Sequence, residues 1–168
     1  METDEDTDLQ KIRNIADYQF GSEVGLSLFP EKVQIIRSRG TGRIRRVLLN
    51  GDLLATLRPT DGLFSLSIEG AKRLSTVPNL VGSRIVVMDS VDDFVRSGKT
   101  VFAKHVLHAS EEIRPKDEVI VLNSKGEVLA CGRALLNGGE MLRFKSGVAV
   151  NVRAGNRSGE RFKQKKSS

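Results

Sequence analysis

Near the start of the chain, apolar residues recur at a spacing of three and four. The positions are Leu9, Ile12, Ile15, Ala16 and Phe20. This spacing places them on one face of a helix, so it predicts an amphipathic helix over residues 9–20, with Thr7 or Asp8 as its N-cap and Gly21 after its last turn. The acidic residues 1–8 before it are expected to be flexible.

The next segment has the composition of β-strands. VQIIRSR (33–39) and RIRRVLL (43–49) flank Gly-Thr-Gly and predict a hairpin. A second hairpin is expected at Asn50-Gly51, because this pair readily adopts the positive φ angles of a type I′ turn.

A further strand, LFSLSI, follows the turn at Pro59-Thr60-Asp61-Gly62, and a short helix is predicted from Glu69 to Leu74. The turn-rich segment STVPNLVGS (75–83) then interrupts the periodicity. We therefore expect a first α+β domain over residues 9–78, built from one sheet and two helices.

The second half predicts a compact β-barrel. It contains five or six short strands with regular turns, and DDFVRSG (92–98) as its one small helix. The barrel is expected over residues 79–153, and the basic tail 154–168, which has almost no apolar residue, is expected to be disordered. The fold class is α+β: a small α+β domain followed by a β pseudo-barrel.

Charge is distributed unevenly along the chain of 168 residues and net charge +6. Residues 1–10 carry five acidic residues and no basic one, whereas residues 153–168 carry six basic residues and one acidic one. Because these ends offset each other, the part between them is basic in its own right, which suits a polyanionic partner. The start of the chain does not resemble a signal peptide and no long apolar run exists, so we expect a cytoplasmic protein without a membrane partner.

Residues with catalytic or metal-binding chemistry are sparse. Cys131 is the single cysteine and lies in an apolar run, which favours a buried structural thiol. His105 and His108 are three residues apart in a strand-like stretch, so they are expected on opposite faces. GKT at 98–100 has Asp93 where a phosphate-binding P-loop has its first glycine. We expect no catalytic residues, no metal, no cofactor and no enzyme activity.

Four arginines surround the predicted tip of the first hairpin. If residues 40–42 form the loop, Arg39 lies opposite Arg43, and Arg37 opposite Arg45. Like charges in such positions destabilise a hairpin unless an anion binds there, so the arrangement favours an RNA-binding site. The alternative is an ordinary solvated tip.

The second half resembles a PUA domain, a pseudo-barrel found in enzymes that modify tRNA and rRNA. Three features in order carry the resemblance: SGKTVFAKHV, then RPKDEVIVLN with its partner GEVLACGRA, then KSGVAVNVR. The first half, with IADYQFG, SLFP and GRIRRVLLNGDLLATLRPTDGLFSLSIEGAKRL, is similar to the region before the PUA domain of archaeal archaeosine-forming tRNA-guanine transglycosylases. The resemblance covers residues 9–153. Those enzymes also carry a catalytic TIM barrel and a cysteine-rich zinc site, for which this sequence has no segment.

The resemblance implies that the junction between the short helix and the following strand lines a groove for an RNA stem or 3′ end. The residues implicated are Arg96, Gly98, Lys99, Thr100, Val101, Phe102, Ala103 and Lys104, with Gly132 and Arg133 on a facing strand. Gly98 is expected to leave backbone donors open to RNA. Phe102 either stacks on a base or belongs to the core. The basic tail either contacts phosphates, keeps the chain soluble or meets an acidic partner.

The resulting hypothesis is an RNA-binding protein that binds tRNA as the non-catalytic partner of a separate tRNA-modifying subunit. The alternative is a translation or ribosome-associated factor, since free-standing PUA proteins also serve there. An independent enzyme is the third and weakest reading.

Overall fold

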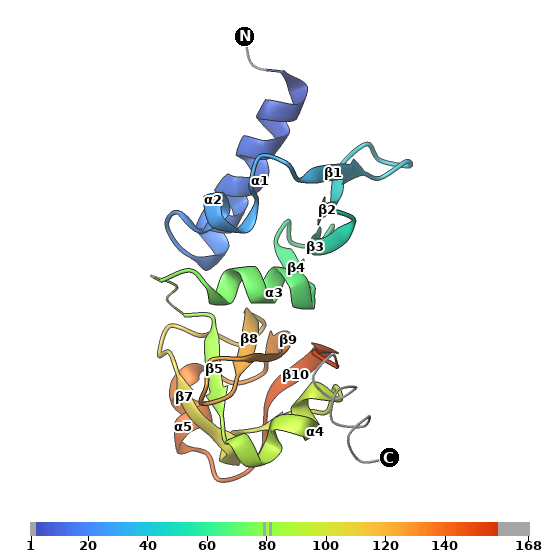
Figure 1. The fold of residues 1–168 in the computed structure, drawn as a ribbon. Helices are drawn as coiled ribbons and strands as arrows, with labels where there is room; N and C mark the ends of the chain where they lie inside the picture. The colour runs from blue at the N-terminus through green and yellow to red at the C-terminus, as the bar shows by residue number, and fades with distance from the viewer. Residues whose placement is uncertain (1–2, 79, 81, 158–168) are drawn as a thin grey trace, which may run out of the picture. The chain divides into compact units, whose positions relative to one another are not determined.

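The computed structural model describes residues 3–78, 80 and 82–157 (Figure 1). The chain divides after Leu80 into two compact units. Both contain helices and strands, so the expected α+β class is confirmed.

The first helix, α1, runs over Asp4–Phe20 and therefore includes residues that the sequence analysis assigned to a flexible segment. It begins there because Thr3 forms a capping box with Asp6. The Asp6 amide donates to the Thr3 hydroxyl at 3.1 Å, and the Thr3 amide donates to the Asp6 carboxylate at 3.2 Å. The acidic residues of the first turn also lie at the positive end of the helix dipole. The acidity of this segment thus favours a helix start.

A short helix that the sequence pattern did not predict, α2 (Val24–Leu28), packs against α1. A Cβ on Gly25 would lie 2.2 Å from the carbonyl oxygen of Arg13, so only glycine allows this approach. The Gly25 amide donates to the Asp17 carboxylate at 2.6 Å. The contact fixes the direction of the chain after Gly21.

The sheet of the first unit is antiparallel, in the order β1-β2-β3-β4. Its strands are β1 (Gln34–Arg37), β2 (Ile44–Leu49), β3 (Asp52–Leu57) and β4 (Phe64–Leu66), and the helix α3 (Ile68–Ser75) follows. Asn50 and Gly51 have φ angles of 53° and 84°, which confirms the expected turn between β2 and β3. The buried side chains of Phe20, Phe29 and Phe64 contribute to the core of this unit.

The second unit is a six-stranded pseudo-barrel with sheet order β6-β10-β9-β8-β5-β7. Its elements are β5 (Arg84–Val87), the 3-10 helix η1 (Asp89–Val91), α4 (Asp92–Arg96), β6 (Val101–Phe102), the 3-10 helix η2 (Ala103–His105), β7 (Val106–Ala109), β8 (Glu118–Leu122), β9 (Val128–Ala134), α5 (Gly138–Arg143) and β10 (Val148–Gly155). β5 pairs with β8 in parallel, and the other pairs are antiparallel.

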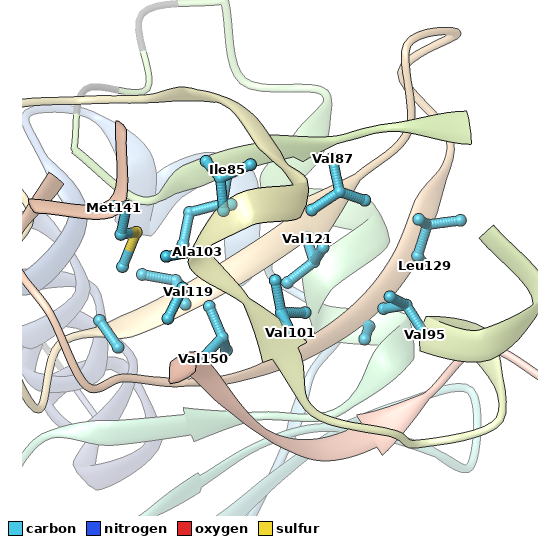
Figure 2. Close-up of a cluster of buried hydrophobic side chains, with 14 of the residues drawn as sticks. Ile85, Val87, Val95, Val101, Ala103, Val119, Val121, Leu129, Met141 and Val150 are labelled. Carbon is cyan, nitrogen blue, oxygen red and sulfur yellow. The ribbon is translucent and has the colours of Figure 1, made fainter. Parts of the chain in front are cut away.

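The core of this unit is formed by side chains from nearly all of these elements (Figure 2). Val87 from β5, Val95 from α4, Val101 from β6, Val121 from β8 and Leu129 from β9 all point into it. Burial of this apolar surface is the main force that brings the strands together.

Two details differ from the sequence expectation. One small helix was predicted in this half, but Asn137 caps a further one, α5: the Glu140 amide donates to the Asn137 side chain at 2.8 Å. Strand β10 continues to Gly155, two residues past the expected end of the domain, and the Asn156 side chain donates to the Val128 carbonyl at 2.9 Å. Most of the predicted disordered tail, residues 158–168, lies outside the described residues.

Candidate nucleic-acid interface

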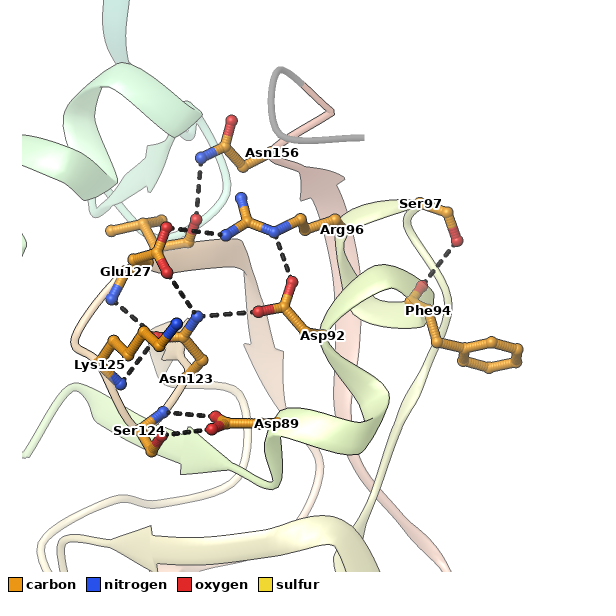
Figure 3. Close-up of polar contacts among 11 residues, drawn as sticks. Asp89, Asp92, Phe94, Arg96, Ser97, Asn123, Ser124, Lys125, Glu127 and Asn156 are labelled. Atoms are coloured by element: carbon orange, nitrogen blue, oxygen red, sulfur yellow. Dashed lines mark hydrogen bonds and ion pairs between the residues drawn. The ribbon is translucent and has the colours of Figure 1, made fainter. Parts of the chain in front are cut away.

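Arg96, proposed from the sequence as an RNA contact, is buried and used internally (Figure 3). Its guanidinium donates to Asp92 at 2.6 Å and to Glu127 at 3.4 Å. Asn123 donates to the same two carboxylates and thereby links α4 to the β8–β9 turn. An arginine that is 6% exposed, with its guanidinium flanked by two carboxylates, is placed to hold α4 in position and has little surface to offer to RNA.

Three successive backbone amides in the turn after α4 are already hydrogen-bonded. The amide of Ser97 donates to Asp93, that of Gly98 to Val95 at 3.0 Å, and that of Lys99 to Phe94 at 3.3 Å. Gly98 has φ +95°, which suits the residue after a helix C-terminus. The Gly98 amide is therefore not left open for RNA, contrary to the expectation, and the exposed basic side chains nearby are the groups that can attract phosphate.

Exposed basic side chains do gather around the short edge strand β6. Lys99 precedes the strand and Lys104 follows it, and both are exposed. β10 pairs with β6, which brings Lys145 close because the Ala103 amide donates to the Gly147 carbonyl at 2.9 Å. Arg157 donates to the Ser97 carbonyl at 3.2 Å, beside Gly98. We call Lys99, Lys104, Lys145 and Arg157 the β6 basic surface.

Sequence reasoning found two members of this surface and missed two. Lys145 could be placed only with the register of β6 against β10, and Arg157 was assigned to the tail. The other residues predicted in this stretch have different positions. Val101 and Ala103 are core residues, whereas Thr100 and Phe102 are half-buried. The ring of Phe102 packs edge-on against His105, with centroids 6.1 Å apart.

Strand β9, which was expected to face β6, is not its direct neighbour in the sheet. β10 lies between β6 and β9, so Gly132 and Arg133 are not directly opposite β6. Gly132 is buried, and a Cβ there would lie 2.2 Å from the Asn151 carbonyl oxygen of β10. This glycine serves the contact between two strands. Arg133 is half-buried and pairs across the sheet with Asn151 on one side and Glu118 on the other.

The arginines at the tip of the β1–β2 hairpin lie in a different strand register from the one assumed. A bulge places Arg37 opposite Ile44 instead of Arg45. Arg37 also has an acidic neighbour: it forms an ion pair with Asp8 of α1 at 2.5 Å and donates to the Gly42 carbonyl at 2.6 Å. The charge of Arg37 is thus compensated within the protein, unlike the sequence interpretation in which an anion must bind there. Arg39, Arg43 and Arg45 are exposed, and within the described chain their side chains form no hydrogen bond or ion pair.

Two loops at this end of the sheet share one hydrogen-bond pattern. In the β1–β2 loop, the Ser38 amide donates to Arg43 and the Gly42 amide donates to Ser38. In the β3–β4 loop, the Arg58 amide donates to Leu63 and the Gly62 amide donates to Arg58. Gly42 and Gly62 have φ +70° and +71°, a conformation that favours glycine. The sequence signals are TG at 41–42 and DG at 61–62.

Side chains able to bind a metal ion do not cluster in the described residues. No cluster of three or more His, Cys, Asp and Glu side chains able to hold a metal ion occurs among them. Cys131 is fully buried, as expected, and burial raises the pKa of its thiol to about 12. In the part of the chain that the structure describes, no helix has the length and apolar character needed to cross a membrane.

Comparisons with known protein families match both units. Residues 10–78 match the patch-forming domain C2 of tRNA-guanine transglycosylase, and residues 83–155 match the PUA domain. The tRNA-guanine(15) transglycosylase of Pyrococcus abyssi is 47% identical over 147 residues, and that of Methanothermobacter thermautotrophicus is 43% identical over 148 residues. Each alignment covers 88% of this chain but only 25% and 23% of the relative, respectively. The chain thus spans about a quarter of the length of these relatives.

Solved structures support the same fold. A hypothetical protein from Pyrococcus horikoshii superposes with a TM-score of 0.71 at 24% identity, over 90% of this chain and 92% of that protein. A conserved PUA domain protein from Thermoplasma acidophilum superposes with a TM-score of 0.65 at 17% identity, over 91% of both chains. The chain therefore contains a transglycosylase patch-forming C2 domain followed by a PUA domain, and it is similar to the C-terminal region of the archaeal tRNA-guanine(15) transglycosylases.

Proposed function

We propose that this protein binds RNA, with tRNA as its ligand, and that it acts as a non-catalytic component of tRNA modification. The observation that carries the proposal is the β6 basic surface on a PUA domain. Four exposed cations surround one edge strand, and side-chain cations of this kind bind phosphate without any need for backbone donors. The relatives named above act on tRNA, which favours tRNA over other RNA.

The free arginines of the first unit supply a second basic region. Arg39, Arg43 and Arg45 carry uncompensated charge at the end of a two-stranded hairpin. Arginine forms forked contacts with phosphate, and a ligand there would relieve the repulsion between these side chains. We include these three residues in the proposed RNA-binding surface and exclude Arg37.

The test is a titration of purified tRNA at increasing salt concentrations. If several lysine and arginine contacts displace counterions, the logarithm of the binding constant falls steeply with the logarithm of the salt concentration. The double variant Lys104→Ala/Lys145→Ala should show a shallower slope and weaker binding. The matched control is Lys116→Ala/Lys125→Ala, which removes the same charge from exposed loops elsewhere in the domain. Equal losses of tRNA affinity in the two double variants would show that the β6 basic surface has no specific role in binding.

The catalytic partner is tested separately. We propose that a transglycosylase-type subunit co-purifies with the tagged protein from native cells, and that the purified chain alone does not exchange guanine in tRNA. Recovery of ribosomal subunits in place of a modifying enzyme would support the alternative role in translation. Base exchange by the pure chain, abolished by a substitution within it, would refute the non-catalytic assignment.

A further inference from the structure

A cavity of about 320 Å³ opens at the end of the first unit's sheet, between the two loops that share a hydrogen-bond pattern. Its volume is at the small end of the range for ligand pockets, about 300–1,000 Å³, and matches a small molecule or one nucleotide. Its walls come from both loops and from the adjacent ends of β2 and β3. The lining residues are Ser38, Thr41, Arg43, Ile44, Arg45, Leu57, Arg58, Pro59 and Gly62.

Arg58 lies on the wall of this cavity and has one unsatisfied donor. Its side chain is only 10% exposed. Asp61 binds one edge of its guanidinium, with Nε to Oδ1 at 3.1 Å and Nη2 to Oδ2 at 3.0 Å. The remaining nitrogen, Nη1, is buried and has no hydrogen-bond partner in the structure. A buried donor without a partner costs free energy, and a ligand would recover it if the guanidinium turned enough to bring Nη1 to the cavity.

The charge around the cavity favours an anion. Arg43 and Arg45 lie beside Arg58 on its wall, and neither has an acidic partner within the described residues. Asp61 offsets one of these three positive charges. The hydroxyl-bearing side chains of Ser38 and Thr41 add hydrogen-bonding capacity at the same wall. A phosphate group matches both the excess charge and the forked geometry of arginine.

The rest of the wall is apolar. Ile44, Leu57 and Pro59 line it, and a bare phosphate would leave this surface unused. A nucleobase presents a flat, weakly polar face that packs on aliphatic side chains or on guanidinium planes. The combination of apolar wall and arginines therefore fits a nucleoside joined to its phosphate better than either part alone.

We infer that this cavity binds one unstacked nucleotide of an RNA chain, with its phosphate on Arg58, Arg43 and Arg45 and its base against Ile44, Leu57 and Pro59. The choice of RNA over a free nucleotide rests on the proposed function. The assignment predicts that the first unit recognises a single-stranded or bulged position, since a base inside a duplex cannot enter a pocket.

The experiment measures binding of a short single-stranded RNA by fluorescence anisotropy, with adenosine 5′-monophosphate, adenosine and inorganic phosphate as competitors. Arg43→Ser and Arg45→Ser should each weaken RNA binding about tenfold, the loss of one charge-assisted contact. The control is Arg46→Ser, which removes an exposed arginine from the same strand but not from the cavity wall. It should change affinity less than about threefold. Arg58→Lys keeps the positive charge but loses the forked guanidinium, and circular dichroism is used to check that this variant folds before its RNA affinity is compared.

The possible outcomes distinguish the assignment of the cavity as a nucleotide site from the wider proposal that the protein binds tRNA. Stronger competition by the nucleotide than by adenosine or phosphate, lost in Arg45→Ser, supports the inference. Losses in Arg43→Ser and Arg45→Ser no larger than in Arg46→Ser overturn it, even if tRNA still binds through the PUA domain. If tRNA does not bind at all, the proposed function fails, and competition by the nucleotide still decides whether the cavity is a nucleotide site. Binding of the free nucleotide as tight as that of the RNA overturns the assignment to RNA.

Discussion

The carboxylate of Glu118 and the guanidinium of Arg153 form a bidentate ion pair between β8 and β10, with Arg153 Nη1 2.9 Å from Glu118 Oε1. The Glu118 side chain is fully buried, whereas that of Arg153 is 36% exposed. A buried carboxylate is tolerated only with such a partner, because its removal from water is costly. This pair should therefore be required for the stability of the PUA unit.

The first prediction is that Arg153→Ala lowers the free energy of unfolding by about 3 kcal/mol, since it leaves a buried charge unpaired. Replacing both residues, as in Glu118→Leu/Arg153→Met, should cost less than Arg153→Ala alone, because no charge remains to be buried. Urea unfolding followed by circular dichroism measures both. A larger loss in the double variant would show that the pair itself stabilises the fold.

The second prediction concerns Cys131, whose thiol has a pKa raised by burial to about 12, from an ordinary value of 9.0. The folded protein should not react with a thiol reagent at pH 8, and one equivalent should react after unfolding. Because the unfolded thiol loses its proton first, its contribution to stability is present below pH 9 and is lost as pH rises toward 12. The stability of the wild type relative to Cys131→Ala should fall over that range. A constant difference would contradict the raised pKa.

A third prediction follows from the ion pair between Arg37 and Asp8. Arg37→Ser should lower stability by about 0.5–1 kcal/mol, the range for a partly exposed pair, and should leave RNA affinity unchanged. Arg45→Ser should have the opposite profile, with weaker RNA binding and no loss of stability. A double-mutant cycle with Asp8→Ala measures the coupling energy of the pair. Zero coupling would mean that the contact does not hold α1 against the hairpin.

The fourth prediction is that Gly132 is needed for packing and not for RNA. Gly132→Ala would place a Cβ 2.2 Å from the Asn151 carbonyl oxygen, so β9 and β10 must separate. We expect a loss of about 1–3 kcal/mol in stability, as for other overpacked sites. Gly40→Ala is the control, because nothing lies within 4 Å of a Cβ there. A stable Gly132→Ala protein with weak RNA binding would restore the role first expected for this glycine.

These cases show which features local sequence patterns can predict. The α+β class and the Asn50-Gly51 turn depend on periodicity and turn chemistry, which act over a few residues. The register at Arg37 depends on a bulge, and the partner of Arg96 lies 31 residues away at Glu127. Spacing along the chain cannot indicate such contacts. The unpaired Nη1 of Arg58 likewise becomes visible only when the two loops are placed side by side.

The last prediction tests whether the β6 basic surface holds an RNA end. Lys99 and Lys104 lie at the two ends of strand β6, and both are exposed. If an acceptor stem or 3′ tail binds along this edge, Lys99→Ala/Lys104→Ala should cost about 1–3 kcal/mol in tRNA binding, the value of one or two charge-assisted contacts.

The measurement compares wild type and variant, each titrated with intact tRNA and with tRNA trimmed of its 3′ nucleotides. The loss should be larger for intact tRNA, because trimming already removes the ligand that the lysines hold. Equal losses with both RNAs would mean that the two lysines supply general positive charge and do not recognise the end. If neither RNA loses affinity, tRNA must be held elsewhere, and Arg43 and Arg45 of the first unit are then the next residues to test, because their charges have no partner within the described chain.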